Sequence, residues 1–209
     1  MKSTTADEVT RDIGRLLAER PLQPKHLCAL LDGASHDQRV AAVRSLGRAE
    51  QRTLYAGVDG FRPVRLVDLV PRGIGDGVTV RHFGRNTLPA FTRFEKRFCR
   101  PRGADRDRPG ELHGFNFQAL QIVTGPGYFV AREDPDRGEV WIDYRRVPDE
   151  RPAGWPAIRP NERGLARFVY GFMVDTLRGV SEHVTIGSAA RRGRDLGSWF
   201  VLCRDASGA

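Results

Sequence analysis

The chain has 209 residues, of which 40% are hydrophobic and 29% charged, and this composition excludes a disordered or collagen-like protein. Its formal charge is +8, but 31 of the 34 basic residues are arginine and acidic residues are interspersed with them, so a nucleic-acid partner is not expected. Three widely spaced cysteines and the lack of a long apolar run predict a soluble cytoplasmic protein with reduced thiols and no membrane span.

Four short helices are expected in residues 1–57. The clearest start signal is Ser35 followed three residues later by Gln38, which is the pattern of a capping box. Other apolar residues recur at helical spacing in three segments: Thr5 to Glu19, Leu27 to Gly33, and Ala49 to Ala56. We expect these helices to form a layer that packs on a body made by residues 58–209.

The sequence pattern changes after residue 57, where strand-like segments and turns follow the expected helices. Apolar residues from Val64 to Val70 and alternating residues from Val78 to Phe83 flank the glycine-rich residues 71–77, so this segment predicts a hairpin. A helix is expected from Thr87 to Cys99, because Phe91, Phe94 and Phe98 are spaced as on one helix side.

Three further segments predict an antiparallel meander. They are joined by short turns rich in glycine and proline, and they run from Phe115 to Thr124, Tyr128 to Glu133, and Glu139 to Val147. Leu120 and Ile122 fall out of phase with the alternation that Phe115 begins, which predicts a bulge that bends the sheet. In the third strand, Trp141 and Asp143 share one face.

A last helix and a last hairpin complete the prediction. Apolar residues at helical spacing predict a helix from Gly164 to Val180, and its wide apolar stripe suggests a contact between copies of the chain. Strands are expected at His183 to Ala189 and Leu196 to Cys203. The sequence thus predicts an α+β fold, with an N-terminal helical layer followed by a curved, mainly antiparallel sheet of about seven strands with two further helices packed on it.

Such a curved sheet could enclose a pocket, and the aromatic and polar residues on its expected inner face are candidate site residues. Asp143 and His183 are the candidate catalytic acid and base. The candidate ligand-binding residues are His82, Phe91, Phe94, Tyr128, Trp141 and Trp199. The alternative is structural: Asp143 pairs with Arg145 or Arg81, and His183 caps a strand at the surface.

Three functions remain open at this stage. The leading one is binding of a small hydrophobic or lipid-like molecule, because aromatic residues are concentrated on the expected inner faces and no reactive motif is found. The second is an isomerase, cyclase or hydrolase that uses the Asp143 and His183 pair. The third is an Arg-rich interaction protein for an acidic partner or nucleic acid. The histidines and cysteines show no metal-ligand spacing, so no metal and no cofactor are expected.

Overall fold

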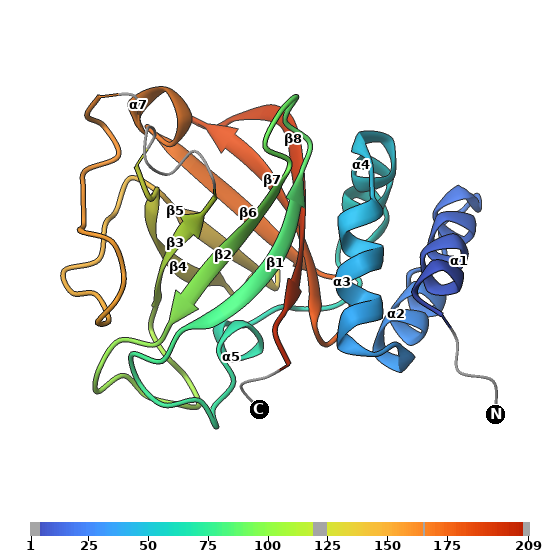
Figure 1. Ribbon diagram of the computed structural model, residues 1–209, viewed down its shortest axis with the longest axis horizontal. Helices are drawn as coiled ribbons and strands as arrows, with labels where there is room; N and C mark the ends of the chain where they lie inside the picture. Colours follow the sequence, from blue (N-terminus) through green and yellow to red (C-terminus); the bar gives the residue numbers. More distant parts are fainter. Residues whose placement is uncertain (1–4, 119–124, 165, 207–209) are drawn as a thin grey trace.

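The computed structural model describes residues 5–118, 125–164 and 166–206, and its main feature is a closed barrel of antiparallel strands (Figure 1). Each strand pairs with the next one along the chain, and the last pairs with the first. The strands are β1 Val80–Asn86, β2 Arg93–Cys99, β3 Leu112–Phe117, β4 Tyr128–Asp134, β5 Glu139–Asp143, β6 Met173–Gly179, β7 Val184–Arg191 and β8 Arg194–Arg204. The predicted antiparallel sheet is confirmed, and its closure into an eight-stranded barrel was not foreseen.

Helices form a layer on one side of the barrel and cover parts of its two ends. Their bounds are α1 Ala6–Ala18, α2 Pro24–Gly33, α3 His36–Ser45, α4 Arg48–Gly57, α5 Leu66–Leu69 and α7 Ala166–Val169. The capping box predicted at Ser35 and Gln38 is confirmed, and Thr5 with Glu8 forms a second one. None of the helices in the described ranges is long and apolar enough to cross a membrane.

The helical layer is attached to the barrel by a shared apolar core. Helices α3 and α4 contact β1, β7 and β8, while α1 and α2 lie farther out (Figure 1). Val43 and Leu54 from this layer belong to one buried cluster with Val184, Ile186 and Val201 from the outer face of the barrel. The outer faces of β7 and β8 are therefore apolar because helices cover them. The division into 1–57 and 58–209 stays a prediction.

The hairpin predicted from Val64 to Phe83 is wrong. Residues Leu66–Leu69 form the short helix α5, and the first strand begins only at Val80. Helix α5 lies across the lower end of the barrel as drawn in Figure 1, where Leu66 and Leu69 are buried in the core. The apolar run that suggested a strand is apolar because it fills the end of the barrel.

Two segments that were predicted to be helices contain strands instead. The segment from Thr87 to Cys99 forms a loop and then β2, because Phe94 and Phe98 also satisfy the two-residue period of a strand. The segment from Gly164 to Val180 forms α7 and then β6. Phe172, with a φ of +61°, separates the two elements in a conformation that no helix contains. The helix that was expected to make a contact between copies of the chain therefore does not exist.

The bulge predicted near Leu120 and Ile122 falls on residues 119–124, which lie outside the described residues. The described part of the sheet has a register irregularity at another place, between Ala189 and Ala190 of β7. At such an irregularity, the residue-by-residue pairing with the neighbouring strand shifts.

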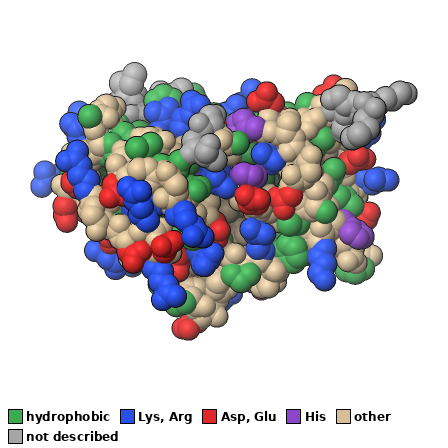
Figure 2. All heavy atoms as spheres, turned by 90° about the horizontal axis from the view of Figure 1, so that it is seen from below, with side chains coloured by type: hydrophobic (Ala, Val, Ile, Leu, Met, Phe, Trp, Pro, Cys, Tyr) green, Lys and Arg blue, Asp and Glu red, His purple; other side chains and the backbone are tan. Residues whose placement is uncertain are grey.

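The lower face of the molecule carries interspersed charges. Figure 2 views the molecule from this side, with Lys and Arg side chains lying among Asp and Glu side chains. The structure contains ion pairs such as Arg137 with Glu139 and Arg72 with Asp107. The positive charge of the chain is thus partly compensated within its own surface.

Candidate functional site

The lumen of the barrel contains a cavity of ≈310 Å³ at the upper end. This volume lies within the range of small-molecule sites, and an eight-stranded barrel is wide enough to hold one small ligand. Apolar side chains dominate its wall: Leu88, Phe94, Phe168, Val169, Tyr170, Met173, Ala189, Leu196, Trp199 and Phe200. The cavity therefore offers an apolar environment inside the fold.

A cluster of buried polar side chains from β2, β3, β6 and the segment that follows β5 lies in the cavity lining. Lys96 on β2 is directly opposite Asn116 on β3, Asp175 lies on β6, and Tyr144 follows β5. Lys96 Nζ donates hydrogen bonds to Asn116 Oδ1 at 3.1 Å and to Asp175 Oδ2 at 3.1 Å, and it also donates to the Tyr144 hydroxyl. We call Lys96, Asn116, Tyr144 and Asp175 the lumen cluster.

The strand period explains why these polar groups lie inside. In β2, Phe94, Lys96 and Phe98 are buried, while Glu95 and Arg97 between them are only partly buried. In β6, Asp175 and Leu177 alternate in the same way with more exposed neighbours. Because alternate residues of a strand point to the same face, each polar residue is carried into the lumen by its apolar neighbours.

Aromatic rings surround the Lys96 ammonium. The distances from Nζ to the ring centroids of Phe94, Phe129, Tyr144 and Phe200 lie between 4.7 and 5.9 Å. A cation near the face of an aromatic ring is stabilised by the quadrupole of the ring. These rings and the Asp175 carboxylate together compensate a charge that is only 2% exposed to solvent.

Burial shifts the proton affinities of all three titratable groups toward their neutral forms. Loss of solvation lowers the pKa of Lys96 and raises the pKa of Asp175, although their mutual attraction opposes both shifts. Loss of solvation also raises the pKa of Tyr144 well above its ordinary value, and the nearby Asp175 carboxylate adds to this effect. Tyr144 therefore remains a protonated hydroxyl, and the Lys96–Asp175 pair has no net charge.

The mouth of the cavity is apolar and partly exposed. Phe168 on α7 is 73% exposed, and Leu88 and Leu196 are also exposed although they line the cavity. Arg191 Nη2 donates to the backbone carbonyls of Phe168 and Val169 at 2.8 and 3.1 Å, which attaches α7 to β7. An apolar molecule can therefore meet apolar side chains before it reaches the lumen.

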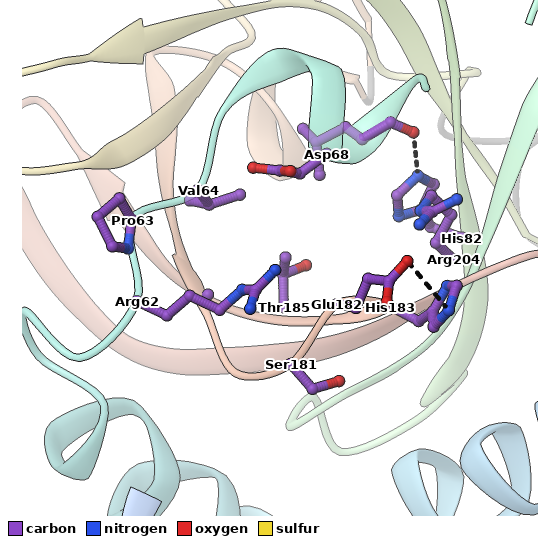
Figure 3. Close-up of a pocket in the computed structure, with 12 residues that line it drawn as sticks. Arg62, Pro63, Val64, Asp68, His82, Ser181, Glu182, His183, Thr185 and Arg204 are labelled. Atoms are coloured by element: carbon purple, nitrogen blue, oxygen red, sulfur yellow. Dashed lines mark hydrogen bonds and ion pairs between the residues drawn. The ribbon is translucent and has the colours of Figure 1, made fainter. Parts of the chain in front are cut away.

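The lower end of the barrel is closed. His82, buried in the wall, donates from Nε2 to the carbonyl of Leu69 in α5 at 3.0 Å. Figure 3 shows the small cavity left beside it, with Arg62, His183 and Arg204 around it and the ion pair between Glu182 and His183 drawn. This cavity measures ≈10 Å³, about enough for one water molecule.

Two of the predicted ligand-binding residues line the upper cavity, namely Phe94 and Trp199. His82 lies at the closed lower end instead. Phe91 is in the loop before β2, is 51% exposed and is not among the residues that line the cavity. The other two lie on the outer surface of the barrel, where Trp141 is exposed and Tyr128 is buried against Trp155.

Asp143 and His183 are not brought together. Asp143 shares the outer face of β5 with Trp141 and forms an ion pair with Arg145 at 2.8 Å, which lowers its pKa against the effect of burial. Asp143 pairs with Val174 near the upper end of β6, whereas His183 follows the lower end of that strand. Roughly 16 Å of strand separates the two positions, so they cannot act as one acid–base pair.

The lumen cluster was not predicted from the sequence, because each of its residues was considered separately and not as a partner of the others. Lys96 falls inside the helix expected from Thr87 to Cys99, and it is one of three lysines in a chain with 31 arginines. Reading 93–99 as a strand would have placed Lys96 between Phe94 and Phe98 on an apolar face. A charged residue in such a position predicts a buried partner, which here is Asp175.

Comparison with known proteins adds no relative: no protein-family model matches the chain, and neither a curated protein nor a solved structure matches it. Among the described residues, no group of three or more His, Cys, Asp or Glu side chains could hold a metal ion.

Proposed function

We propose that the protein binds one small, mainly apolar molecule in the upper cavity of the barrel, with the polar end of that molecule against the lumen cluster. The single observation that supports this function best is the combination of an apolar cavity of ≈310 Å³ with buried polar groups in its lining. A pocket with apolar walls and a few convergent polar groups is typical of small-molecule sites.

Other hollows fit this function less well. A hollow of ≈290 Å³ near Cys99 and His113 has a more polar lining. Burial raises the pKa of the Cys99 thiol to about 12, so this residue stays protonated and is a poor nucleophile. Another hollow lies on the outer face of the barrel beside Phe172 and Arg192.

The binding proposal is tested by titration with 1-aminoanthracene, a neutral apolar dye whose fluorescence rises in apolar surroundings. We expect saturable enhancement with a stoichiometry of about one dye per chain, because the lumen holds one small ligand. No enhancement with the wild-type protein would refute the proposal.

A matched pair of variants locates the bound dye. Ala189 lines the cavity, while Ala190 is the next residue of β7 and lines the outer hollow. We expect Ala189→Phe to abolish the enhancement by filling the lumen and Ala190→Phe to leave it unchanged. Thermal unfolding of both variants shows whether each is folded, and equal dye binding by the two would place the dye outside the barrel.

A further inference from the structure

One buried acceptor of the lumen cluster has no donor among the residues that the structure describes. The three N–H groups of Lys96 are used by Asn116, Tyr144 and Asp175 Oδ2. The Tyr144 hydroxyl reaches Asp175 Oδ2 at 3.2 Å, and Asn116 Nδ2 donates to Tyr144 at 3.0 Å. Asp175 Oδ1 is buried and has no hydrogen-bond partner among the described residues.

The unpaired oxygen belongs to a residue of the cavity lining. Asp175 is only 2% exposed, and it lines the upper cavity together with Lys96, Asn116 and Tyr144. A buried carboxylate oxygen without a donor is unfavourable, so a ligand that supplies a donor there gains binding free energy. A ligand that places only an acceptor at this point meets a carboxylate oxygen and is disfavoured.

The charge of the cluster restricts the ligand further. The ion pair of the Lys96 ammonium and the Asp175 carboxylate is neutral overall. A carboxylate or ammonium group placed against the lumen cluster would therefore bring an uncompensated charge there, which costs desolvation free energy. The other charged residue of the lining, Arg191, lies at the mouth of the cavity and is bound to the backbone carbonyls of Phe168 and Val169. A neutral polar group avoids this cost.

From these two restrictions we infer that the ligand is an apolar alcohol whose hydroxyl group donates a hydrogen bond to Asp175 Oδ1. This inference rests on the proposed function, because it names the ligand class of the same cavity. It goes beyond that function because an apolar pocket alone would accept hydrocarbons, ketones, acids and alcohols of equal size without this preference.

Displacement of the bound dye by matched ten-carbon ligands tests the inference. We expect 2-decanol to bind about tenfold tighter than 2-decanone, because the ketone has the same shape and lacks the donor. Decane, decanoate and decylammonium are expected to bind more weakly than the alcohol. Equal affinities for 2-decanol and 2-decanone, or tighter binding of decylammonium, would overturn the inference and leave the proposed function intact. If no ligand displaces the dye, both fail.

A variant identifies the acceptor. In Asp175→Asn, the amide oxygen can keep the contact with Lys96, and the amide nitrogen then replaces Oδ1 as a donor. We expect the preference for alcohol over ketone to disappear, since both oxygens accept from an amide. Thr176→Val, on the next residue of β6, should keep the wild-type preference. A wild-type preference in Asp175→Asn would place the hydroxyl elsewhere. If Asp175→Asn does not fold, the wild-type ligand series still decides the question.

Discussion

The two ends of the barrel both bury charged groups, but these groups have different partners. At the lower end, Arg100 is fully buried and donates to the backbone carbonyls of Val70, Pro71 and Ile74, so it binds the segment that closes the barrel. At the upper end, Lys96 binds the side chains of other strands, next to a cavity of ≈310 Å³. The comparison shows two uses of a buried cation in one barrel. Arg100 binds the backbone of the segment that closes the lower end, whereas Lys96 binds other side chains and leaves the upper end open.

The largest expected effect comes from breaking the upper cluster. Lys96→Met leaves the Asp175 carboxylate buried without its cation, and we expect a loss of about 3–5 kcal/mol in the free energy of unfolding. The double variant Lys96→Met/Asp175→Leu removes both charges and should recover most of this loss. Urea denaturation measures both values, and a double variant no more stable than the single one would contradict the pairing.

We expect the free energy of unfolding to decrease in acid because of His82 at the lower end of the barrel. Burial lowers the pKa of His82 to about 3, compared with 6.5 for a free imidazole, although the hydrogen bond to Leu69 opposes this shift. Below pH 6.5 the unfolded chain takes up a proton that the folded chain does not, so the stability is complete above pH 6.5 and falls toward pH 3. We expect His82 to contribute about 4 kcal/mol to this loss.

The variant His82→Gln tests whether His82 causes the loss of stability in acid, since glutamine can keep a hydrogen bond to Leu69 without titrating. Its free energy of unfolding between pH 6.5 and 3 should decline less steeply than that of the wild type, while dye binding at pH 7 stays unchanged. Identical pH profiles for the two proteins would assign the acid sensitivity to other groups.

A smaller effect is expected from narrowing the upper lumen. A Cβ at Gly187 would lie 2.2 Å from Cζ of Phe200, a ring of the cavity wall, so Gly187→Ala must displace that ring. We expect dye affinity to fall about tenfold and stability to fall by about 1–3 kcal/mol. Gly73→Ala is the matched control because a Cβ there meets nothing within 4 Å. Unchanged dye affinity in Gly187→Ala would show that Phe200 does not limit the site.

The smallest effect is expected on the outside of the barrel. Trp141 is 45% exposed on the outer face of β5, so Trp141→Ala should leave dye affinity unchanged. The change in stability should stay within about 0.5 kcal/mol, as for most surface substitutions. A clear loss of dye binding would show that ligands reach the outer face and would remove the distinction between lumen and surface.

The sequence predicts the N-terminal helices well, because their signals are local. The capping box at Ser35 and Gln38 satisfies backbone groups within one turn, so it can be recognised without knowing the rest of the fold. The antiparallel character of the centre also follows from short turns. Closure of the barrel depends on the pairing of β1 with β8, whose residues lie more than a hundred positions apart, and no local pattern reports it.

The residues of the lumen cluster make the strands that carry them harder to recognise in the sequence. Lys96 and Asp175 replace apolar residues at alternating positions of β2 and β6, which weakens the two-residue period and leaves Phe and Leu at helical spacing. Both misread helices contain a member of the lumen cluster. A break in local consistency of this kind is expected at functional sites.

The burial of Lys96 also makes it a chemical reporter. The other lysines, Lys2 and Lys25, lie in the first 25 residues of the sequence, so an amine-specific reagent that reacts within the barrel can react only at Lys96. Acylation of that amine requires access to the lumen, and its rate therefore measures how readily the reagent reaches Lys96 through the mouth of the cavity. A molecule that occupies the cavity should slow this reaction, so its binding could be measured by mass spectrometry without any label.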